Sequence, residues 1–414
     1  MAKIRIAFIK FGGLSAGGTE RWLQMMAANL PKDRFEVDYY YCDAAPYLGS
    51  DSRHADTNPE RLKYMLDNQV NLIKFKVGFK DVTVSTHDWI KTDFWEKFDE
   101  SKYDIVQAAK AGPAEYPFNK MKKVRIVDSV HLLGVDHNPN IFWTCFLSEW
   151  SRLKWSQMGG SLSKSSVIYA SVEKPVTDDD LRAELKISAD STVAGFHQRP
   201  DNNIASEIPL KAFAQIQQPN WHFVIMGGGE FYRKQAKNLG LQNVHFLEAS
   251  ADYNRVSSFL NTLDIFAHGR KDGETFGTVF AEAMIHGLPC LSHWTGIADA
   301  QEETMNKGGL FAANLEDYKD KLKEFFENRE LREGLGNFGK KYAEEFYTID
   351  NSVKKLCSVY EKVMEDAPAT KIIAGNNLEK NRANRISFRN RIKILVYNKY
   401  FFICYRFFRK IFKK

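Results

Sequence analysis

The sequence has few cysteines, and their positions match neither a disulfide framework nor a metal site. There are five in 414 residues, and no two of them form a Cys-x-x-Cys pair. This pattern excludes a disulfide scaffold and a cysteine-based zinc site, and it is typical of a reducing compartment. The five are Cys42, Cys145, Cys290, Cys357 and Cys404.

Long apolar runs are also missing. No stretch of about 20 apolar residues occurs, so the sequence predicts no transmembrane helix. The N-terminal segment Met-Ala-Lys-Ile-Arg-Ile-Ala-Phe-Ile-Lys has charges inside its apolar run, unlike the core of a signal peptide. We therefore expect a catalytic body in the cytoplasm.

Glycine and proline are too scarce for a fibrous or disordered chain, with 26 and 12 residues respectively. The hydrophobic fraction of 44% and the charged fraction of 27% are those of a globular protein. At this length we expect more than one domain. No acidic cluster of the kind that holds magnesium is evident, so we expect no metal and no cofactor.

Positive charge is confined to one end of the chain. The segment 380–414 contains twelve Lys or Arg and no Asp or Glu, whereas the whole chain has a net charge of +6. The rest of the chain is therefore mildly acidic, which argues against a nucleic-acid-binding body.

Short β-branched or aromatic runs alternate with helical patterns in two series. This alternation predicts two doubly wound α/β domains with parallel sheets and right-handed crossovers. The first series of expected strands is Ile4–Ile9, Phe35–Tyr41, Asn71–Val77, Tyr103–Ala108, Val124–Asp128 and Phe142–Leu147. The second is Thr192–Phe196, Trp221–Met226, Val244–Leu247, Leu263–Ala267 and Pro289–Ser292.

The break between the series falls near Ser171–Asp190, which reads as a linker leading into a short helix. Three helices are expected to close the chain, at Leu315–Asn328, Glu330–Phe346 and Asn351–Glu365. The predicted units are a first Rossmann-like domain over 1–170, a second over 171–345, a closing helix over 346–365, and a linker with a basic tail over 366–414.

The segment Gly269–Gly287 is the most informative part of the chain. It follows an expected strand, opens with glycines and charges, and then predicts a helix from about residues 276–278 to Gly287. Glu274 would lie before this helix and Glu282 inside it. Free amides at the helix start would favour a phosphate group, and the two carboxylates could accept hydrogen bonds from sugar hydroxyls.

This segment resembles the family 4 GT-B glycosyltransferases. The shared features are the two glutamates, the Phe-Gly between them and the Ala-Met-x-x-Gly-Leu-Pro after them. Two further segments match the family: Gly-Gly-Thr-Glu-Arg near the N-terminus, and Trp-His-Phe-Val-Ile-Met-Gly-Gly-Gly-Glu in the second half. The resemblance therefore covers roughly residues 1–365.

The resemblance implies a GT-B fold, with two facing Rossmann-like domains and the donor site in the cleft between them. It implies a retaining, metal-independent transfer from a nucleotide-diphosphate sugar, in which the acceptor attacks on the face that the diphosphate leaves. The residues that it assigns to catalysis are Arg199, Glu274 and His131. Those that it assigns to donor binding are Gly12, Gly13, Gly227, Phe276, Gly277, Thr278 and Glu282.

The sequence departs from the family pattern at two places. Arg199 matches the arginine that grips the diphosphate, but Asn202 and Asn203 stand near the position of the partner lysine. Either Arg270 or Lys271 substitutes, or turnover is slow, or neutral donors hold the phosphates. A second family histidine is replaced by the segment 107–110, Gln-Ala-Ala-Lys.

Several of these residues also have purely structural interpretations. The spacing at Gly12, Gly13, Gly17 and Gly18 fails the dinucleotide fingerprint, and each glycine could serve a turn or a close approach to the donor. His131 and His268 could be core histidines or functional ones.

The tail over 385–414 interleaves aromatic residues with cations. It is too charged to span a bilayer, and it fits a helix lying in the membrane interface with its cations at anionic headgroups. A partner protein and single-stranded nucleic acid are the alternatives, and we do not expect nucleic acid because no other basic segment accompanies the tail.

We therefore expect a glycosyltransferase at the inner face of the membrane, acting on a glycan or lipid-linked saccharide in polysaccharide or glycoconjugate synthesis. The alternatives are another GT-B activity, such as a nucleotide-sugar epimerase or transfer to a small soluble acceptor, and a non-catalytic glycan-binding or scaffold protein.

Overall fold

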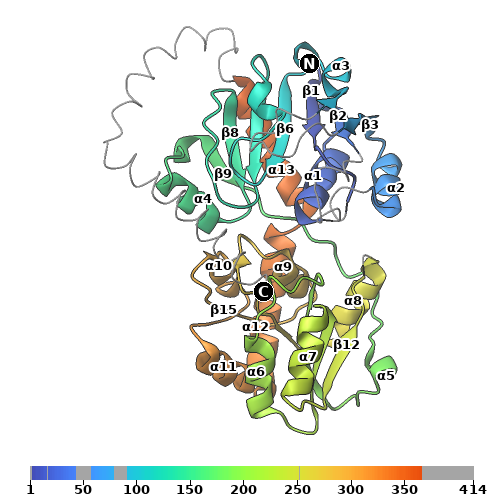
Figure 1. Cartoon of the computed structure of the whole chain (residues 1–414), viewed down its shortest axis with the longest axis vertical. Coiled ribbons are helices and arrows are strands. Elements are labelled where there is room, and N and C mark those ends of the chain that lie inside the picture. Colours follow the sequence, from blue (N-terminus) through green and yellow to red (C-terminus); the bar gives the residue numbers. More distant parts are fainter. Residues whose placement is uncertain (1, 16, 43–56, 79–90, 251, 366–414) are drawn as a thin grey trace.

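The computed structural model describes residues 2–15, 17–42, 57–78, 91–250 and 252–365. Within them the chain forms two α/β domains, which lie one above the other in Figure 1, each built on a parallel sheet with helices on its faces. The predicted fold class is confirmed. The basic tail over 385–414 lies outside the described residues.

The first sheet has seven parallel strands in the order β3-β2-β1-β6-β7-β8-β9. Because the chain continues from β1 to β2 on one side and reaches β6 on the other, strand order reverses beside β1. The strands are β1 (Ile4–Ile9), β2 (Phe35–Tyr41), β3 (Asn71–Lys74), β6 (Ile105–Lys110), β7 (Arg125–Val130), β8 (Ile141–Phe146) and β9 (Ser165–Val167).

The second sheet has six strands in the order β12-β11-β10-β13-β15-β17, and here the order reverses beside β10. Its strands are β10 (Thr192–Gln198), β11 (Trp221–Gly227), β12 (Val244–Leu247), β13 (Ile265–Ala267), β15 (Cys290–His293) and β17 (Gly309–Ala312). Ligands of doubly wound folds bind at the carboxyl edge where strand order reverses. The loops after β1, β10 and β13 are therefore the candidate positions for a functional site.

Two small ladders lie outside these sheets. The antiparallel pair β4 (Val77–Gly78) and β5 (Lys91–Thr92) belongs to the first domain. The parallel pair β14 (Gly273–Glu274) and β16 (Ala298–Asp299) joins the loops that follow β13 and β15.

Helices cover the sheets of both domains. Those of the first domain are α1 (Gly18–Asn29), α2 (Pro59–Asp67), α3 (Phe94–Lys97) and α4 (Glu149–Gln157). Those of the second are α5 (Arg182–Leu185), α6 (Ile208–Ile216), α7 (Glu230–Asn238), α8 (Tyr253–Thr262), α9 (Thr278–Ile285), α10 (Gln301–Met305), α11 (Leu315–Glu327) and α12 (Arg329–Phe346).

The last described helix, α13 (Ile349–Glu365), returns to the first domain, where it lies against the upper sheet in Figure 1. The hydroxyl of Tyr360 donates to the side-chain oxygen of Gln107 at 2.8 Å, and the ring of Tyr360 packs edge-on against Phe35. The chain thus crosses between the domains twice, once before α5 and once after α12.

Candidate functional site

The two glutamates of the sequence motif lie on either side of the N-terminus of α9. Glu274 is in β14 and Glu282 is in the second turn of α9. The helix begins at Thr278, after Gly277 with a φ of 82°, and Gly287 with a φ of 80° follows its end. The predicted start is confirmed, and the helix ends at Ile285, just before the predicted end at Gly287.

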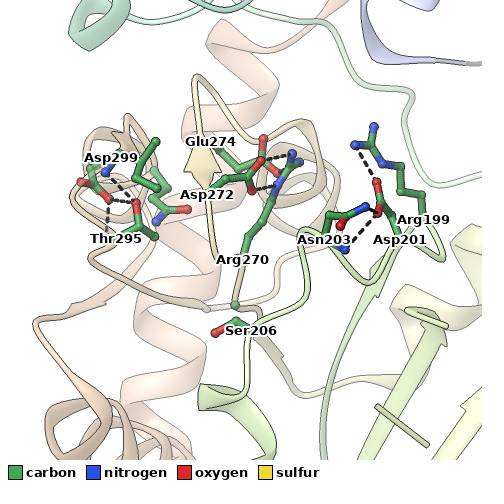
Figure 2. Close-up of polar contacts among 12 residues, drawn as sticks. Arg199, Asp201, Asn203, Ser206, Arg270, Asp272, Glu274, Thr295 and Asp299 are labelled. Atoms are coloured by element: carbon green, nitrogen blue, oxygen red, sulfur yellow. Dashed lines mark hydrogen bonds and ion pairs between the residues drawn. The ribbon is translucent and has the colours of Figure 1, made fainter. Parts of the chain in front are cut away.

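Glu274 is held by a cation from its own loop. Nη1 of Arg270 donates to Oε1 of Glu274 at 2.8 Å, while Nε and Nη2 of the same guanidinium contact the carboxylate of Asp272 (Figure 2). Burial raises the pKa of Glu274, and the charge of Arg270 opposes this only in part. Glu274 is therefore a partly buried carboxylate, with 19% of its side chain exposed, whose ionisation depends on its neighbours.

Glu282 is held by a residue of the other domain. Nη1 of Arg21, in α1, lies 3.2 Å from Oε1 of Glu282, and Nε2 of His197 lies 3.2 Å from Oε2. Burial favours the protonated carboxyl, but His197 and the positive charge of Arg21 outweigh it and hold the pKa of Glu282 below its usual value. Glu282 is thus an ionised acceptor at the domain boundary, and its side chain is not the solvated helix residue that the spacing alone would allow.

The start of α9 presents backbone amides rather than a side-chain cap. Gly277 makes no side-chain hydrogen bond to the first turn, and the first amides of a helix have no partner inside the helix. Thr278 is the first helical residue. The ring of Phe276 is buried against Tyr169 and Tyr347, so only its backbone remains available to a donor.

The loop after β10 carries Arg199, the arginine that the resemblance assigns to the diphosphate. Its side chain is 48% exposed and forms an ion pair with Asp201 at 3.3 Å. Asp201 also accepts hydrogen bonds from the backbone and side chain of Asn203, as Figure 2 shows. Asn203, near the position of the family lysine, is therefore part of the turn that supports Arg199.

Gly227, the last residue of the neighbouring strand β11, packs against the start of this loop at Gln198. It has a φ of 74°, and a Cβ there would lie 2.1 Å from the carbonyl oxygen of Gln198. Only glycine allows the ends of β10 and β11 to approach so closely.

On the first domain, Gly12 and Gly13 follow β1 and are both buried. The carbonyl of Gly12 accepts from the amide of Cys42 at 3.0 Å, which shows a structural contact at this glycine. The two glycines lie at the carboxyl end of β1, beside the switch in strand order.

His131 follows β7 and its imidazole is buried. The ring packs edge-on against Trp22 at 5.4 Å, and Nε2 has no hydrogen-bond partner among the described residues. Burial and the nearby charge of Lys10 lower the pKa of His131 to about 3, so the ring is neutral at physiological pH. His268 is similarly buried, packed against Phe196 and Phe280, which is the environment of a core histidine.

One residue between the two glutamates joins the domains. Oγ1 of Thr275 donates to the carbonyl of His131 at 2.7 Å, and the carbonyl of Thr275 accepts from the hydroxyls of Ser148 and Ser151 at 2.6 and 3.1 Å. The loop before α9 is therefore docked on the first domain. Thr275 lies inside the motif segment, but nothing in the sequence marks it as an interdomain contact.

Where the resemblance would place a second histidine, the structure has a buried ion triad. The ammonium of Lys110, at the end of β6, contacts Asp136 and lies 3.1 Å from Asp128. Burial opposes the charge of Lys110, but the two carboxylates more than compensate and raise its pKa. Burial also raises the pKa of Asp128 to about 6. These three side chains are enclosed in the first domain, so we assign them a structural role at the carboxyl ends of β6 and β7.

Within the described ranges, no three His, Cys, Asp or Glu side chains are grouped as metal ligands. In the same ranges, no helix combines the length and the apolar character that crossing a bilayer requires.

Known proteins resemble this chain in sequence and in fold. Residues 178–342 match the model of the family "Glycosyl transferases group 1". An uncharacterised glycosyltransferase of Methanocaldococcus jannaschii is 27% identical over 156 residues, which are 36% of this chain and 43% of the relative. The match thus spans less than half the length of that relative.

Solved structures share the fold over most of the chain. The Anabaena protein HepE in complex with UDP and glucose has a TM-score of 0.63 and 18% identity, over 87% of this chain and 100% of that one. WaaG, a glycosyltransferase involved in lipopolysaccharide biosynthesis, has a TM-score of 0.60 and 15% identity, over 84% and 98% of the two chains. Residues 178–342 thus match the glycosyl transferases group 1, and the chain as a whole has the two-domain fold of the GT-B glycosyltransferases.

Proposed function

We propose that this protein transfers a sugar from a nucleotide-diphosphate sugar to an acceptor hydroxyl, with retention at the anomeric carbon and without a metal ion. The observation that carries the proposal is the placement of Glu274 and Glu282 on either side of the start of α9, at the boundary with the first domain. In this arrangement the amides at the start of α9 would bind a phosphate, and the two carboxylates would accept hydrogen bonds from hydroxyl groups on either side of it.

Each part of the donor has a matching group in this site. The amides of Gly277 and Thr278, with the half-exposed guanidinium of Arg199, would hold the diphosphate. Glu282 would accept from the ribose hydroxyls and Glu274 from those of the transferred sugar. UDP is the first nucleotide to test, because HepE has been crystallised with it.

The reaction needs no nucleophile from the protein. The acceptor oxygen forms a bond to the anomeric carbon on the face from which the diphosphate leaves, and the bond from that carbon to the phosphate oxygen breaks. A diphosphate oxygen takes the hydroxyl proton, so the products are the glycoside and the nucleoside diphosphate. The protein stabilises the departing charge and positions the acceptor.

We propose a membrane-linked glycan or glycolipid as the acceptor, with the enzyme peripheral on the cytoplasmic face of the membrane. Two observations support this choice. The basic aromatic tail suits an anionic surface. In addition, four exposed apolar side chains flank the segment 273–275: Leu132 and Leu133 follow His131, and Trp294 and Ile297 precede β16.

The test is turnover of UDP-, GDP-, dTDP- and ADP-sugars by the full chain, with and without EDTA, followed by mass spectrometry of the products. We expect one nucleotide to stabilise the protein and its sugar to be hydrolysed slowly, and to be transferred when lipid extract is added. The anomeric configuration of the product, read by NMR, tests retention.

Glu282→Ala should abolish this turnover, whereas Glu333→Ala, on the exposed face of α12, serves as the matched control. Nucleotide binding without turnover by the wild-type protein would instead support a non-catalytic scaffold. Loss of turnover in EDTA that added magnesium restores would show that a metal takes part.

A further inference from the structure

Arg270 has an unusual environment for a cation beside a proposed diphosphate site. Its Nε and Nη2 contact Oδ1 and Oδ2 of Asp272 at 2.6 and 3.1 Å, and its Nη1 contacts Glu274 at 2.8 Å. All three nitrogens of the guanidinium therefore face carboxylates. A two-pronged contact of this kind fixes the plane of the guanidinium, and so fixes the direction of Nη1.

The backbone of Arg270 is fixed as well. It forms an antiparallel bridge with Ala205, and the amide of Lys271 donates to the carbonyl of Ile204 at 2.9 Å. These contacts tie the loop after β13 to the loop after β10, which carries Arg199. The side chain of Arg270 is only 20% exposed, so this position is set by packing as well as by charge.

This arrangement argues against Arg270 as a replacement for the family lysine. One guanidinium shared between two carboxylates leaves the group with a net negative charge when both carboxylates are ionised, and such a group does not attract a diphosphate. It does hold one carboxylate in place. Arg270 engages only Oε1 of Glu274, so an ionised Glu274 can still accept a sugar hydroxyl at Oε2.

We propose that Arg270 is a positioning residue of the donor site, which orients the Glu274 carboxylate toward the transferred sugar. The inference rests on the proposed function for the identity of the sugar. The diphosphate is left to Arg199 and the amides of α9.

The experiment compares Arg270→Gln and Arg270→Lys with the wild-type chain, and uses Arg233→Ala as the control. Arg233 lies in α7 and pairs with Glu248, whose side chain is 92% exposed. For each protein, kcat/KM for the nucleotide sugar is measured from pH 5 to 9, and the affinity for the free nucleoside diphosphate is measured by calorimetry.

For Arg270→Gln we expect kcat/KM to fall about 10²-fold, because Glu274 loses its orientation, while the affinity for the nucleoside diphosphate stays within about twofold. The acid limb of the pH profile should move to higher pH, since the partly buried carboxyl of Glu274 takes up a proton more readily without its cation. Arg270→Lys keeps the positive charge but cannot make the two-pronged contact with Asp272. We therefore expect its acid limb to lie close to that of the wild type, while its kcat/KM remains reduced.

An equal loss of affinity for the free nucleoside diphosphate would overturn the proposal, because it would place Arg270 on the phosphates. Unchanged kcat/KM and an unchanged acid limb would overturn it as well.

A second measurement does not depend on any donor. In the free protein, the carboxyl ¹³C resonance of Glu274, assigned by its loss in Glu274→Gln, should titrate at higher pH in Arg270→Gln than in the wild type. If no nucleotide sugar is bound or turned over, the proposed function fails, but this titration still decides whether Arg270 controls Glu274. No shift in the titration would reject the proposal.

Discussion

Arg21 and Glu282 are 261 positions apart in the chain, and their side chains meet at 3.2 Å across the domain boundary. The same guanidinium contacts Glu173 at 3.1 Å, in the segment where the chain passes from the first domain to the second. The glutamate that the motif assigns to donor binding is therefore also part of the interface that holds the two domains together.

Removing this contact should lower the stability of the folded protein. In Arg21→Ala, the buried Glu282 loses one of its two partners, and we expect the free energy of unfolding to fall by about 2 kcal/mol. Urea unfolding followed by tryptophan fluorescence measures the change. Arg233→Ala, which breaks an exposed pair, should change it by less than about 0.5 kcal/mol. Equal losses in the two variants would show that the interdomain pair contributes no more to the free energy of unfolding than an exposed pair does.

Gly277 should tolerate no side chain. Its φ is 82°, and a Cβ would lie 2.5 Å from Cδ2 of Phe280, so Gly277→Ala should lower stability by about 1–3 kcal/mol and weaken binding of the nucleoside diphosphate. Thermal unfolding and calorimetry measure the two effects.

The matched control for Gly277 is Gly334→Ala, inside α12, where a Cβ would meet no atom within 4 Å. This change should instead stabilise the protein by up to about 1 kcal/mol, because alanine favours a helix more than glycine does. Destabilisation by Gly334→Ala, or none by Gly277→Ala, would contradict the backbone argument.

The buried His131 should make stability depend on pH. Its pKa is about 3 in the folded protein, below the ordinary value of 6.5, so the unfolded chain takes up a proton below pH 6.5 while the folded protein does not. The contribution of this residue to stability is present above pH 6.5 and is lost as the pH falls.

His131→Phe keeps a ring against Trp22 but cannot titrate. Relative to the wild type, we expect the variant to become more stable as the pH falls below 6.5, by about 1.4 kcal/mol for each pH unit down to pH 5. Urea unfolding at pH 7.5, 6 and 5 measures the difference. A difference that does not change with pH would mean that the pKa of His131 is the same in the folded and the unfolded chain.

The tail prediction can be tested by truncation. A chain ending at Glu365 should keep donor hydrolysis but lose binding to vesicles that contain anionic lipid, because it loses the twelve cations of 380–414. Co-sedimentation measures binding, and neutral vesicles and high salt are the controls. Continued sedimentation of the truncated protein with anionic vesicles would reject a membrane role for the tail.

Much of the fold is encoded locally and could be predicted. Strands at Ile4–Ile9, Phe35–Tyr41 and Val244–Leu247 have the predicted limits, and α9, α11, α12 and α13 lie within a residue or two of their predicted ends. A run of β-branched or aromatic residues specifies these strands, and a helical period closed by a glycine or an asparagine specifies α9 and α11. The two glutamates could be placed around the start of a helix for the same reason.

Within the two main sheets, the strands that escaped prediction are β9 and β17, which lie at sheet edges and are three and four residues long. Ser165–Val167 contains two serines and Gly309–Ala312 begins with glycine, so neither has the composition of a strand. Pairing with a neighbouring strand, rather than propensity, makes them strands.

The sequence by itself determined the two-domain α/β fold and the segment that carries the candidate site, because hydrophobic period, turn residues and a short motif are local properties. Only the tertiary structure decided which partners the two glutamates have: Arg21 for Glu282, Arg270 for Glu274, and His131 opposite Thr275. Two of these three contacts join residues more than 140 positions apart, and no local pattern encodes them. They arise where the two domains pack together, so that burial and complementary charge select the partners.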